Sequence, residues 1–276
     1  MFYGHFTLPK KKSGVRDINP PNPELKSIQY RIKQLLDKGI RWPSYLHGGI
    51  SGCSIVTNAR PHVGQEIVAT FDVKDFYPST REENVSQILI AGSMSGGVAK
   101  TVSALCCYRG VLPQGAVTST CLANLAFQYI DHQLVRLADR HGLVYTRYID
   151  DVTLSGGTVL ISMQGTIRRI IESGGYKISV AALAGRNKRQ VVTGLVVNRK
   201  LRPAGKFITG LRGLIRSCWP DDLGPEMAAT IEGLTTVQLK NRIFGQINHI
   251  KQFDTKLARE IRALVVKIIW PWCVPC

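Results

Sequence analysis

The chain has 276 residues, of which 44% are hydrophobic and 20% are charged, proportions that exclude a disordered polymer and a coiled coil. Its 36 Lys and Arg exceed its 19 Asp and Glu, and the resulting net charge of +17 predicts a polyanionic partner, for which nucleic acid is the first candidate. The basic residues are spread over several segments rather than gathered on one amphipathic helix, which disfavours a membrane surface as that partner.

The N-terminal region predicts a basic β-hairpin followed by an amphipathic helix. Residues 6–9 read as a strand, and residues 10–16 read as a basic turn and the start of a returning strand. After three prolines, apolar residues recur at helical spacing over residues 25–36, and the opposite face of that helix is basic.

Two later segments predict strands that present carboxylates. Residues 67–73 form a short apolar run, typical of a buried central strand, and Asp72 lies near its end. Residues 144–149 and 152–155 predict a hairpin, with Asp150 and Asp151 at the turn between its two strands.

The C-terminal region predicts two helices with basic flanks. Apolar stripes run over residues 239–250 and 257–268, and Lys240 and Lys251 are among the basic residues beside them. The tail segment 268–272 is too apolar to be left in water without a reason, so it either packs on these helices or docks a partner protein. Because no internal repeat is visible, we expect one cooperative unit with lobes.

Cysteine usage and the absence of a targeting segment predict the compartment. The seven Cys residues lack the paired spacing of a disulfide framework, and the terminal Cys273 and Cys276 lack the second pair of ligands that a structural zinc site needs. No apolar run reaches the roughly 18 residues of a membrane-spanning helix, and the first residues do not resemble a secretion signal. We therefore expect a soluble protein of the reducing cytoplasm, with no membrane partner.

The carboxylates predict a metal site in an otherwise basic chain. Asp150 and Asp151, joined by Asp72 from a neighbouring strand, would repel one another unless a hard divalent cation neutralised them. In phosphoryl transfer a pair of such ions activates the attacking hydroxyl and stabilises the leaving oxygen. An Asp-Asp pair alone is more often ordinary turn chemistry, so this interpretation depends on its context.

Three motifs supply that context. They are Phe71-Asp72-Val73-Lys74-Asp75-Phe76-Tyr77-Pro78-Ser79, Leu112-Pro113-Gln114-Gly115-Ala116 and Tyr148-Ile149-Asp150-Asp151. Their order and separation resemble those of reverse transcriptases. Within that family the chain is similar to the retron-type bacterial branch, because it also carries Asn58-Ala59-Arg60-Pro61-His62 and Val192-Thr193-Gly194. The resemblance extends from about Phe6 to the segment Gly245–Ile250 and covers nearly the whole chain.

The resemblance implies an α+β fold of the right-hand polymerase type, in which a mixed palm sheet backed by helices presents the aspartates. Residues 1–66 would form the fingers and residues 206–276 the thumb. Residues 67–205 would form the palm, with a fingers insertion near residues 80–110.

The resemblance also implies roles for individual residues. Asp72 and Asp150 would bind two Mg²⁺ ions, with help from the Val73 carbonyl and support from Asp151. Tyr77 would close the space of a ribose 2′-hydroxyl and so select deoxynucleotides. The other residues expected to bind the nucleotide are Lys10 and Arg16, on the triphosphate, and Gln114 and Gly115, beside the nascent base pair. The residues expected to bind RNA are Asn58, His62, Thr193, Gly194, Lys240 and Lys251.

Several of these residues also have a purely structural interpretation. Tyr77 could be a core aromatic, Gln114 and Gly115 a tight turn, and Thr193 and Gly194 a turn at a strand edge. His62 could contact RNA or support the scaffold, whereas catalysis by His62 is not expected. Part of the basic helix flanks could be ordinary solvated surface, and Lys11 and Lys12 could contact only the template.

The chain departs from the family pattern at a few positions. Val117 and Ile149 stand where Pro and Ala are usual, and neither change removes a chemical group. A lysine commonly found after the catalytic hairpin, a proposed proton donor to pyrophosphate, would align near Ala182. Lys177 or Lys188 could substitute for it.

The activity implied by the resemblance is RNA-templated DNA synthesis. The template would be a dedicated structured noncoding RNA, priming would come from a 2′-hydroxyl within it, and the product would remain linked to the RNA (msDNA) in a system of antiphage defence with an effector or toxin protein. One alternative is another bacterial reverse transcriptase, of the intron-encoded or abortive-infection type. A second is a polymerase-shaped scaffold that holds RNA and DNA and restrains an effector with little synthesis.

Overall fold

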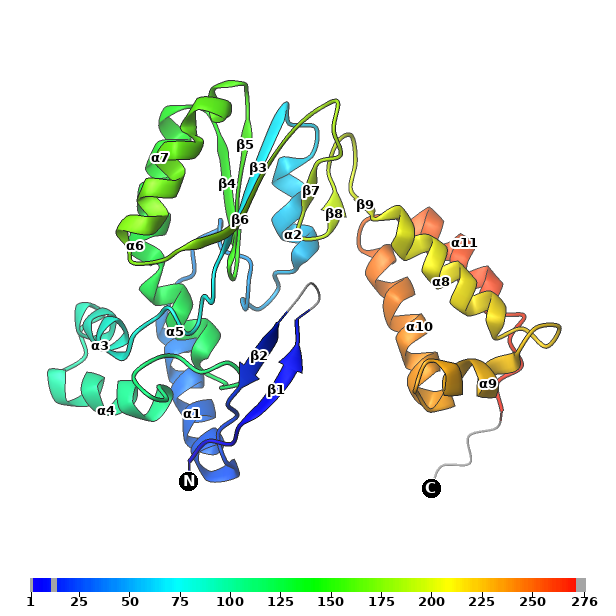
Figure 1. The fold of residues 1–276 in the computed structure, drawn as a ribbon, viewed down its shortest axis with the longest axis horizontal. Helices are drawn as coiled ribbons and strands as arrows, with labels where there is room; N and C mark the ends of the chain where they lie inside the picture. Colours follow the sequence, from blue (N-terminus) through cyan, green and yellow to red (C-terminus); the bar gives the residue numbers. More distant parts are fainter. Residues whose placement is uncertain (1, 11–13, 272–276) are drawn as a thin grey trace.

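A four-stranded sheet lies at the centre of the computed structural model, which describes residues 2–10 and 14–271 (Figure 1). The strands are β3 (Ile67–Val73), β4 (Val144–Tyr148), β5 (Asp151–Gly156) and β6 (Ile178–Gly185), in the spatial order β4-β5-β3-β6. Neighbouring strands pair antiparallel, and a parallel bridge between Leu46 and Arg147 extends the sheet beyond β4. The predicted central strand over residues 67–73 is confirmed, and the parallel component of the expected mixed sheet is this bridge.

The two faces of the sheet differ because side chains alternate along each strand. Phe71, Val152 and Leu154 belong to the main hydrophobic core, to which α5 (Ser119–Ala126), α6 (Gln128–Arg140) and α7 (Val159–Ser173) also contribute. On the opposite face, Val68 packs in a smaller cluster with residues of α2 (Ile55–Ala59), β7 (Val191–Val192) and β8 (Leu195–Val196). Helices therefore back one face, while the other face remains partly open.

The N-terminal region forms a hairpin and a group of helices below the sheet in Figure 1. β1 (Phe6–Pro9) and β2 (Val15–Ile18) pair antiparallel, which confirms the predicted hairpin, and Lys11 and Lys12 lie outside the described residues. The following helix, α1 (Pro23–Gly39), is longer than predicted and is capped by the side chain of Asn22. It packs beside α4 (Gly96–Cys106), which lies against α3 (Glu82–Ala91).

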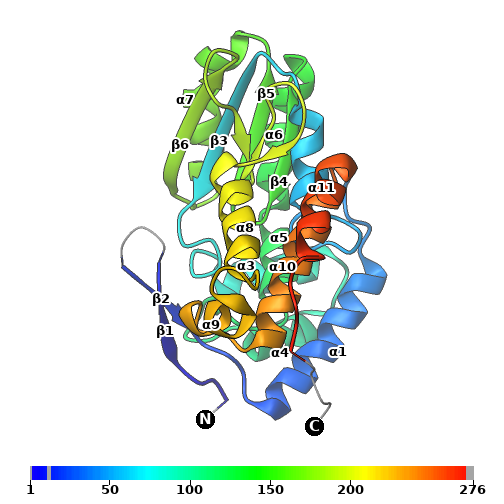
Figure 2. The same cartoon turned by 90° about the vertical axis from the view of Figure 1, so that its right-hand side faces the viewer.

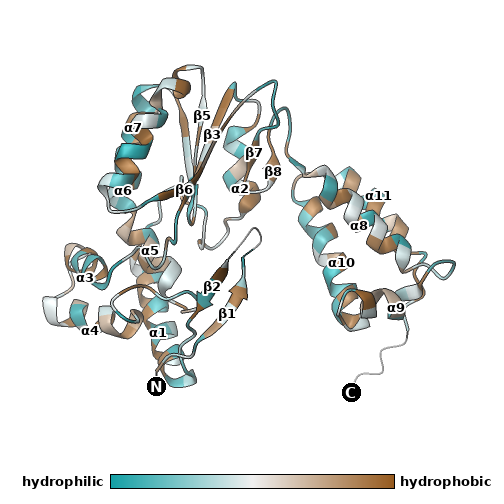
Figure 3. Ribbon diagram, viewed as in Figure 1, coloured by the Kyte–Doolittle hydropathy of each residue, from teal (hydrophilic) through white to brown (hydrophobic). Residues whose placement is uncertain are grey.

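The C-terminal region is a helical unit with its own core. β9 (Arg202–Pro203) pairs with β8 and leads into α8 (Gly205–Ser217), α9 (Gly224–Ile231), α10 (Thr236–Lys251) and α11 (Thr255–Val265). Figure 2 shows α8, α10 and α11 side by side, and Figure 3 shows that these helices carry both hydrophobic and hydrophilic residues. Phe253 packs against both this core and the α2–β8 cluster, so it connects the two parts.

The apolar tail packs on the C-terminal helical unit as far as the structure describes it. Ile268 is buried in that core and Trp270 packs against it, whereas Ile269 is 71% exposed. Trp272, Cys273 and Cys276 lie outside the described residues. None of the described helices is long and apolar enough to cross a bilayer.

His62 connects the short 3₁₀ helix η1 (Arg60–His62) to the open face of the sheet. The side chain is fully buried, and its ring nitrogens lie 2.6 Å from Ser155 Oγ and 2.7 Å from Thr146 Oγ1. Burial, with a smaller effect of His47, lowers the pKa of His62 to about 3. The fold therefore holds a neutral imidazole that joins β4 to β5.

The low pKa of His62 predicts an acid-dependent loss of stability. In the unfolded chain a histidine is protonated below pH ~6.5, so the stability that the neutral imidazole contributes is lost as the pH falls from there towards 3. We expect the unfolding free energy of His62→Gln to fall less steeply between pH 6.5 and 5 than that of the unchanged protein, by about 1 kcal/mol per pH unit. Urea denaturation at several pH values measures both slopes, and equal slopes would contradict this assignment.

Candidate active site

The hairpin formed by β4 and β5 is here called the catalytic hairpin, because it carries Asp150 and Asp151, which are expected to bind metal. Its turn lies one residue earlier than the sequence predicts. Tyr148 pairs with Asp151, so Ile149 and Asp150 form the connection between β4 and β5, and Asp151 is the first residue of β5. Ile149 has a φ of 58°, a conformation that β-branched residues rarely adopt. A two-residue hairpin loop requires a positive φ at its first position. Tertiary contacts impose this positive φ on Ile149, and the turn therefore lies one residue earlier than the sequence predicts.

Two neighbours hold this strained turn. The Arg147 guanidinium donates a hydrogen bond of 2.9 Å to the Ile149 carbonyl. Gly48 lies so close that a Cβ there would be 2.2 Å from the Ile149 nitrogen, so no larger residue fits without moving the turn. Contacts with Arg147 and with Gly48 thus fix the conformation of the hairpin turn.

Arg147 is itself held by a buried ion pair with Asp131 of α6. Both side chains are at most 1% exposed, and the guanidinium donates to both carboxylate oxygens of Asp131, at 2.8 and 2.7 Å. It also donates to Asn124 Oδ1 at 2.8 Å. Burial alone would lower the pKa of Arg147, but the Asp131 carboxylate outweighs it and keeps that pKa above its ordinary value. The sequence analysis missed this network, although a charged residue at an inward position of a strand could have signalled it.

The three predicted carboxylates converge on the open face of the sheet. Asp72 and Asp151 are register partners on β3 and β5, and the Val73 amide donates to the Asp150 carbonyl at 3.0 Å. The pairing with β6 is irregular between Asp72 and Val73, because Asp72 pairs with Val180 and Val73 with Ile178, which leaves Ser179 of β6 as the extra residue of a bulge. Residues about 80 positions apart in the chain are therefore neighbours.

The electrostatics of these carboxylates suit a divalent cation. Burial, followed by the charges of Asp150 and Asp72, raises the pKa of Asp151 to about 6. Burial also raises the pKa of Asp150, and Asp72 adds to that shift. Within the described part of the chain, no set of three His, Cys, Asp or Glu side chains is already arranged to hold a metal ion. The donors fit a hard cation by their oxygen chemistry and by their mutual repulsion, which Arg16 and Arg147 offset only in part at Asp150, and they do not form a closed ligand set.

A cavity of about 610 Å³, here called the hairpin cavity, brings together most of the predicted nucleotide residues. Its walls come from the β1–β2 hairpin, the end of β3, the loop after it and the catalytic turn. They include Lys10, Arg16, Asp72, Val73, Tyr77, Gln114 and Asp150. Lys10 Nζ lies 3.4 Å from Asp75 Oδ1, so the basic hairpin already contacts the opposite wall.

Gln114 and Gly115 connect the hairpin to this cavity. The Asn19 amide donates to the Gln114 carbonyl at 2.8 Å, which places the turn against the end of β2. Gly115 has a φ of 103°, and a Cβ there would lie 2.9 Å from Ile18 Cγ2, so glycine is required on both grounds.

Tyr77 is held at the wall of the hairpin cavity. Its hydroxyl lies 2.9 Å from Thr120 Oγ1, and burial raises its pKa, so the phenol stays neutral. The ring also packs on Phe76, with 5.8 Å between the centroids. Thr120, which the sequence analysis did not single out, thus orients the side chain expected to select the sugar.

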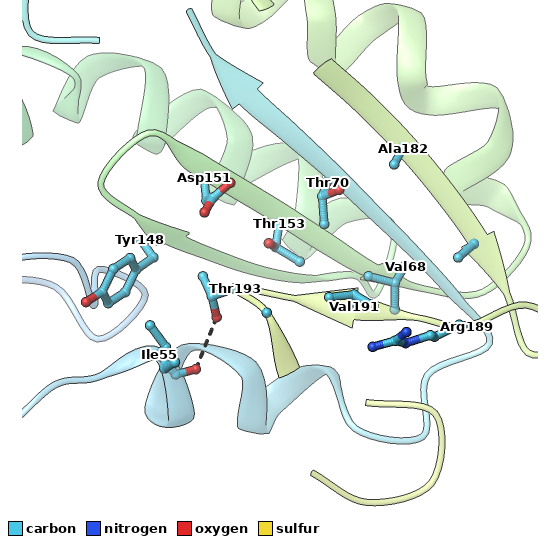
Figure 4. Close-up of a pocket in the computed structure, with 12 residues that line it drawn as sticks. Ile55, Val68, Thr70, Tyr148, Asp151, Thr153, Ala182, Arg189, Val191 and Thr193 are labelled. Atoms are coloured by element: carbon cyan, nitrogen blue, oxygen red, sulfur yellow. Dashed lines mark hydrogen bonds between the residues drawn. The ribbon is translucent and has the colours of Figure 1, made fainter. Parts of the chain in front are cut away.

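A second cavity, of about 420 Å³, lies on the open sheet face and is here called the sheet-face cavity (Figure 4). Tyr148, Asp151 and Thr153 of the catalytic hairpin line one side, and Thr193 and Gly194 line another. The Thr193 hydroxyl donates to the Ile55 carbonyl at 3.2 Å, drawn as a dashed line in Figure 4. This contact fixes the turn after β7 against α2.

The other predicted RNA-binding residues lie in different environments. Asn58 and His62 are fully buried, and Asn58 Nδ2 lies 3.5 Å from Thr193 Oγ1. These positions suit scaffold support, the alternative interpretation of His62, and leave neither side chain surface for direct RNA contact. Lys240 and Lys251 are exposed on α10, and the Lys240 ammonium lies 5.6 Å from the Trp270 ring.

Lys177 and Lys188, the two candidate replacements for the expected lysine, lie at opposite ends of β6. Ala182 pairs with Thr70 and lies on the edge strand β6. The Lys177 carbonyl accepts from the Lys74 amide at 2.7 Å, immediately beyond the end of β3. Lys188 lies in the loop after β6, where its carbonyl accepts from Asn198. Lys177 is therefore the candidate closer in the fold to Asp72.

The buried ion pair predicts a large effect of a conservative change. Asp131→Asn would leave the Arg147 charge uncompensated in the core, and we expect it to lower the unfolding free energy by about 3 kcal/mol. Asp139→Asn, at an exposed position of the same helix, is the matched control and should change it by less than about 0.5 kcal/mol. Urea denaturation measures both, and equal values for the two variants would contradict the role given to this pair.

Comparison with known proteins identifies the family of the chain. Residues 8–180 match the family described as reverse transcriptase (RNA-dependent DNA polymerase). The chain is 34% identical over 221 residues to the Retron Mx65 reverse transcriptase of Myxococcus xanthus, a match that covers 72% of this chain and 52% of that protein. It is 32% identical over 205 residues to the Retron Ec86 reverse transcriptase of Escherichia coli, covering 72% and 64%. The chain thus spans between half and two thirds of the length of these two relatives.

Solved structures show the same fold at low sequence identity. Telomerase from Candida albicans, in a complex with a fragment of telomeric RNA, is similar with a TM-score of 0.53 and 11% identity, over 92% of this chain and 54% of that one. Apo telomerase from Candida tropicalis is similar with a TM-score of 0.56 and 8% identity, over 96% and 60%. The fold is that of a right-hand polymerase, and with the family match over residues 8–180 the chain belongs to the reverse transcriptase (RNA-dependent DNA polymerase) family, in which it resembles the retron-type members.

Proposed function

We propose that this protein is an RNA-directed DNA polymerase whose active site is the hairpin cavity. The observation that carries the proposal is that Asp72 and Asp150 open into the same cavity as Lys10, Arg16 and Tyr77. Acidic groups at one wall and basic groups at another are what a nucleoside triphosphate with its metal ions requires. The membership of the reverse transcriptase family supports the same activity.

Each residue of the cavity has a role in this proposal. Lys10 and Arg16 bind the phosphate oxygens of the incoming triphosphate. Gln114 and Gly115 lie against the nascent base pair, and Tyr77 excludes a ribose 2′-hydroxyl. Asp72, Asp150 and the Val73 carbonyl hold two Mg²⁺ ions, with Asp151 in support, and these ions supply the Lewis-acid chemistry of phosphoryl transfer.

We further propose that the template is a dedicated structured noncoding RNA and that the product remains linked to it. Support comes from the resemblance to retron reverse transcriptases and from the net charge of +17, which suits a large RNA partner. Thr193 and Gly194 would contact this RNA on the sheet face, and Lys240 and Lys251 would bind its phosphates at the C-terminal helical unit. The proposed setting is cytoplasmic antiphage defence with an effector or toxin protein, for which the exposed Ile269 is a candidate contact.

Removal of one carboxylate tests the assignment of the site. Asp72→Asn and Asp150→Asn should each lower Mg²⁺-dependent incorporation of deoxynucleotides on an RNA template by at least about 1000-fold, because each removes a metal ligand. Mg²⁺ should raise the melting temperature of the unchanged protein and not that of these variants. Asp139→Asn is the control and should retain both properties.

Nucleic acid that copurifies with the protein from its host tests the proposed product. We expect a discrete DNA joined to RNA with the unchanged protein, and RNA alone with Asp150→Asn. Undiminished incorporation by Asp150→Asn would refute the site, whereas heterogeneous RNA without linked DNA would favour the scaffold alternative.

The hydrogen bond between Tyr77 and Thr120 predicts an effect on sugar selection. Tyr77→Ala should raise the ratio of ribonucleotide to deoxynucleotide incorporation by roughly 10- to 100-fold, because the space for the 2′-hydroxyl opens. Thr120→Val removes the partner of the phenol and should raise the same ratio by a smaller factor, whereas Thr120→Ser keeps the hydroxyl and should not. Single-nucleotide incorporation with matched nucleotides measures the ratio, and no change in Tyr77→Ala would contradict the role of this ring.

A further inference from the structure

We propose that Gly49 is a positioning residue for sugar selection, which sets the orientation of the Tyr77 ring through Thr120. The inference rests on the role that the proposed function gives to Tyr77, and it adds to that role a residue from a loop before α2. Gly49 belongs to none of the motifs that indicated the family.

The loop that carries Gly49 is held at the edge of the sheet and against α5. The His47 amide donates to the Arg147 carbonyl of β4 at 2.9 Å. The Asn124 side chain of α5 donates from Nδ2 to the Gly48 carbonyl, also at 2.9 Å. These hydrogen bonds fix the backbone immediately before Gly49, and a movement of Gly49 away from α5 would strain them.

The absence of a side chain at position 49 makes room for Thr120. A Cβ on Gly49 would lie 2.4 Å from Thr120 Cγ2, far inside the usual contact distance of two carbon atoms. The hydroxyl of the same threonine lies 2.9 Å from the Tyr77 hydroxyl. The methyl group of Thr120 thus faces the loop, while its hydroxyl contacts the phenol.

The two groups of Thr120 share one Cβ, so neither moves without the other. The χ1 angle of threonine occupies staggered wells about 120° apart, and in a helix it uses only two of them. The α5 backbone has little freedom to shift, because Leu122 and Ala123 are fully buried in the main core. A side chain at position 49 is therefore accommodated by a rotation of Thr120, which carries its hydroxyl away from Tyr77.

Loss of this hydrogen bond changes how the phenol is held. Tyr77 lines the hairpin cavity, and its ring is fixed there by the contact with Thr120 and by packing on Phe76. Exclusion of a ribose 2′-hydroxyl depends on the distance between the ring and the sugar, so a small displacement of the ring weakens the selection. Gly49 thus acts on sugar discrimination and not on the affinity for the deoxynucleotide.

Fluorine NMR tests the coupling without requiring synthesis. The probe is the full chain with 3-fluorotyrosine in place of tyrosine, in which the Tyr77 resonance is the one that Tyr77→Phe removes. We expect Gly49→Ala to shift this resonance, as Thr120→Val does. An unmoved Tyr77 resonance in Gly49→Ala would overturn the proposal.

Gly52→Ala is the matched control for backbone strain. Gly49 and Gly52 lie in the same loop with φ values of 75° and 77°, which alanine rarely adopts. A Cβ on Gly52 would have no atom within 4 Å, so this variant carries the strain without the clash. It should leave the Tyr77 resonance in place, and an equal shift in both variants would contradict a route through Thr120.

Nucleotide selection and its rescue test the consequence. Gly49→Ala should raise the ratio of ribonucleotide to deoxynucleotide incorporation by about three- to tenfold, with the KM for the deoxynucleotide unchanged. Thr120→Ser removes the methyl group, keeps the hydroxyl, and leaves 3.4 Å between a Cβ at position 49 and the Cβ at position 120. The double variant Gly49→Ala/Thr120→Ser should therefore regain the original ratio. A ratio that stays raised in the double variant would contradict the proposal.

The outcomes separate this inference from the proposed function. A Tyr77 resonance that moves in Gly49→Ala, in a protein that incorporates no deoxynucleotide on any RNA template, would support the positioning role and refute the polymerase activity. A polymerase in which Tyr77→Ala changes the sugar ratio, while Gly49→Ala changes neither the ratio nor the resonance, would do the reverse.

Discussion

The catalytic hairpin depends on one buried guanidinium. Arg147 forms an ion pair with Asp131, donates to the carbonyl of the strained Ile149, and lies 4.7 Å from the Phe127 ring and 5.7 Å from the Phe76 ring. Phe76 precedes Tyr77, so the same charge supports both the turn that carries Asp150 and the loop that carries the expected sugar selector. Because a buried charge is tolerated only with its partners in place, this network couples the geometry of the active site to the integrity of the core.

The open face of the sheet differs from this network, because its carboxylates lie close together without a directly paired cation among the described residues. Burial, and then the charge of Asp72, raises the pKa of both Asp150 and Asp151, and the Thr153 hydroxyl near them has no partner among the described residues. Such groups destabilise a fold unless a ligand completes them, which is why they concentrate at functional sites.

The carboxylates line two different cavities: Asp72 and Asp150 line the hairpin cavity, and Asp151 lines the sheet-face cavity. The hairpin cavity takes its basic residues from the β1–β2 hairpin, whereas residues of β5 and of the turn after β7, which α2 supports, are among those that line the sheet-face cavity. The exposed Lys240 and Lys251 of α10 belong to the separate C-terminal helical unit.

Local pattern was enough to predict the central strand, the basic hairpin and the C-terminal helices, because periodicity and turn composition are encoded within a few residues. The grouping of the carboxylates was predicted from three motifs together and from the family that they resemble. Local pattern placed the hairpin turn one residue too late, since the positive φ of Ile149 accompanies contacts with the distant Gly48 and with an Arg147 that the distant Asp131 holds in place. The burial of Asn58 and His62, the pairing of Arg147 with Asp131, and the close approach of Gly49 to Thr120 also required the tertiary structure. Each depends on packing between segments far apart in sequence, and such packing leaves no local periodic signal.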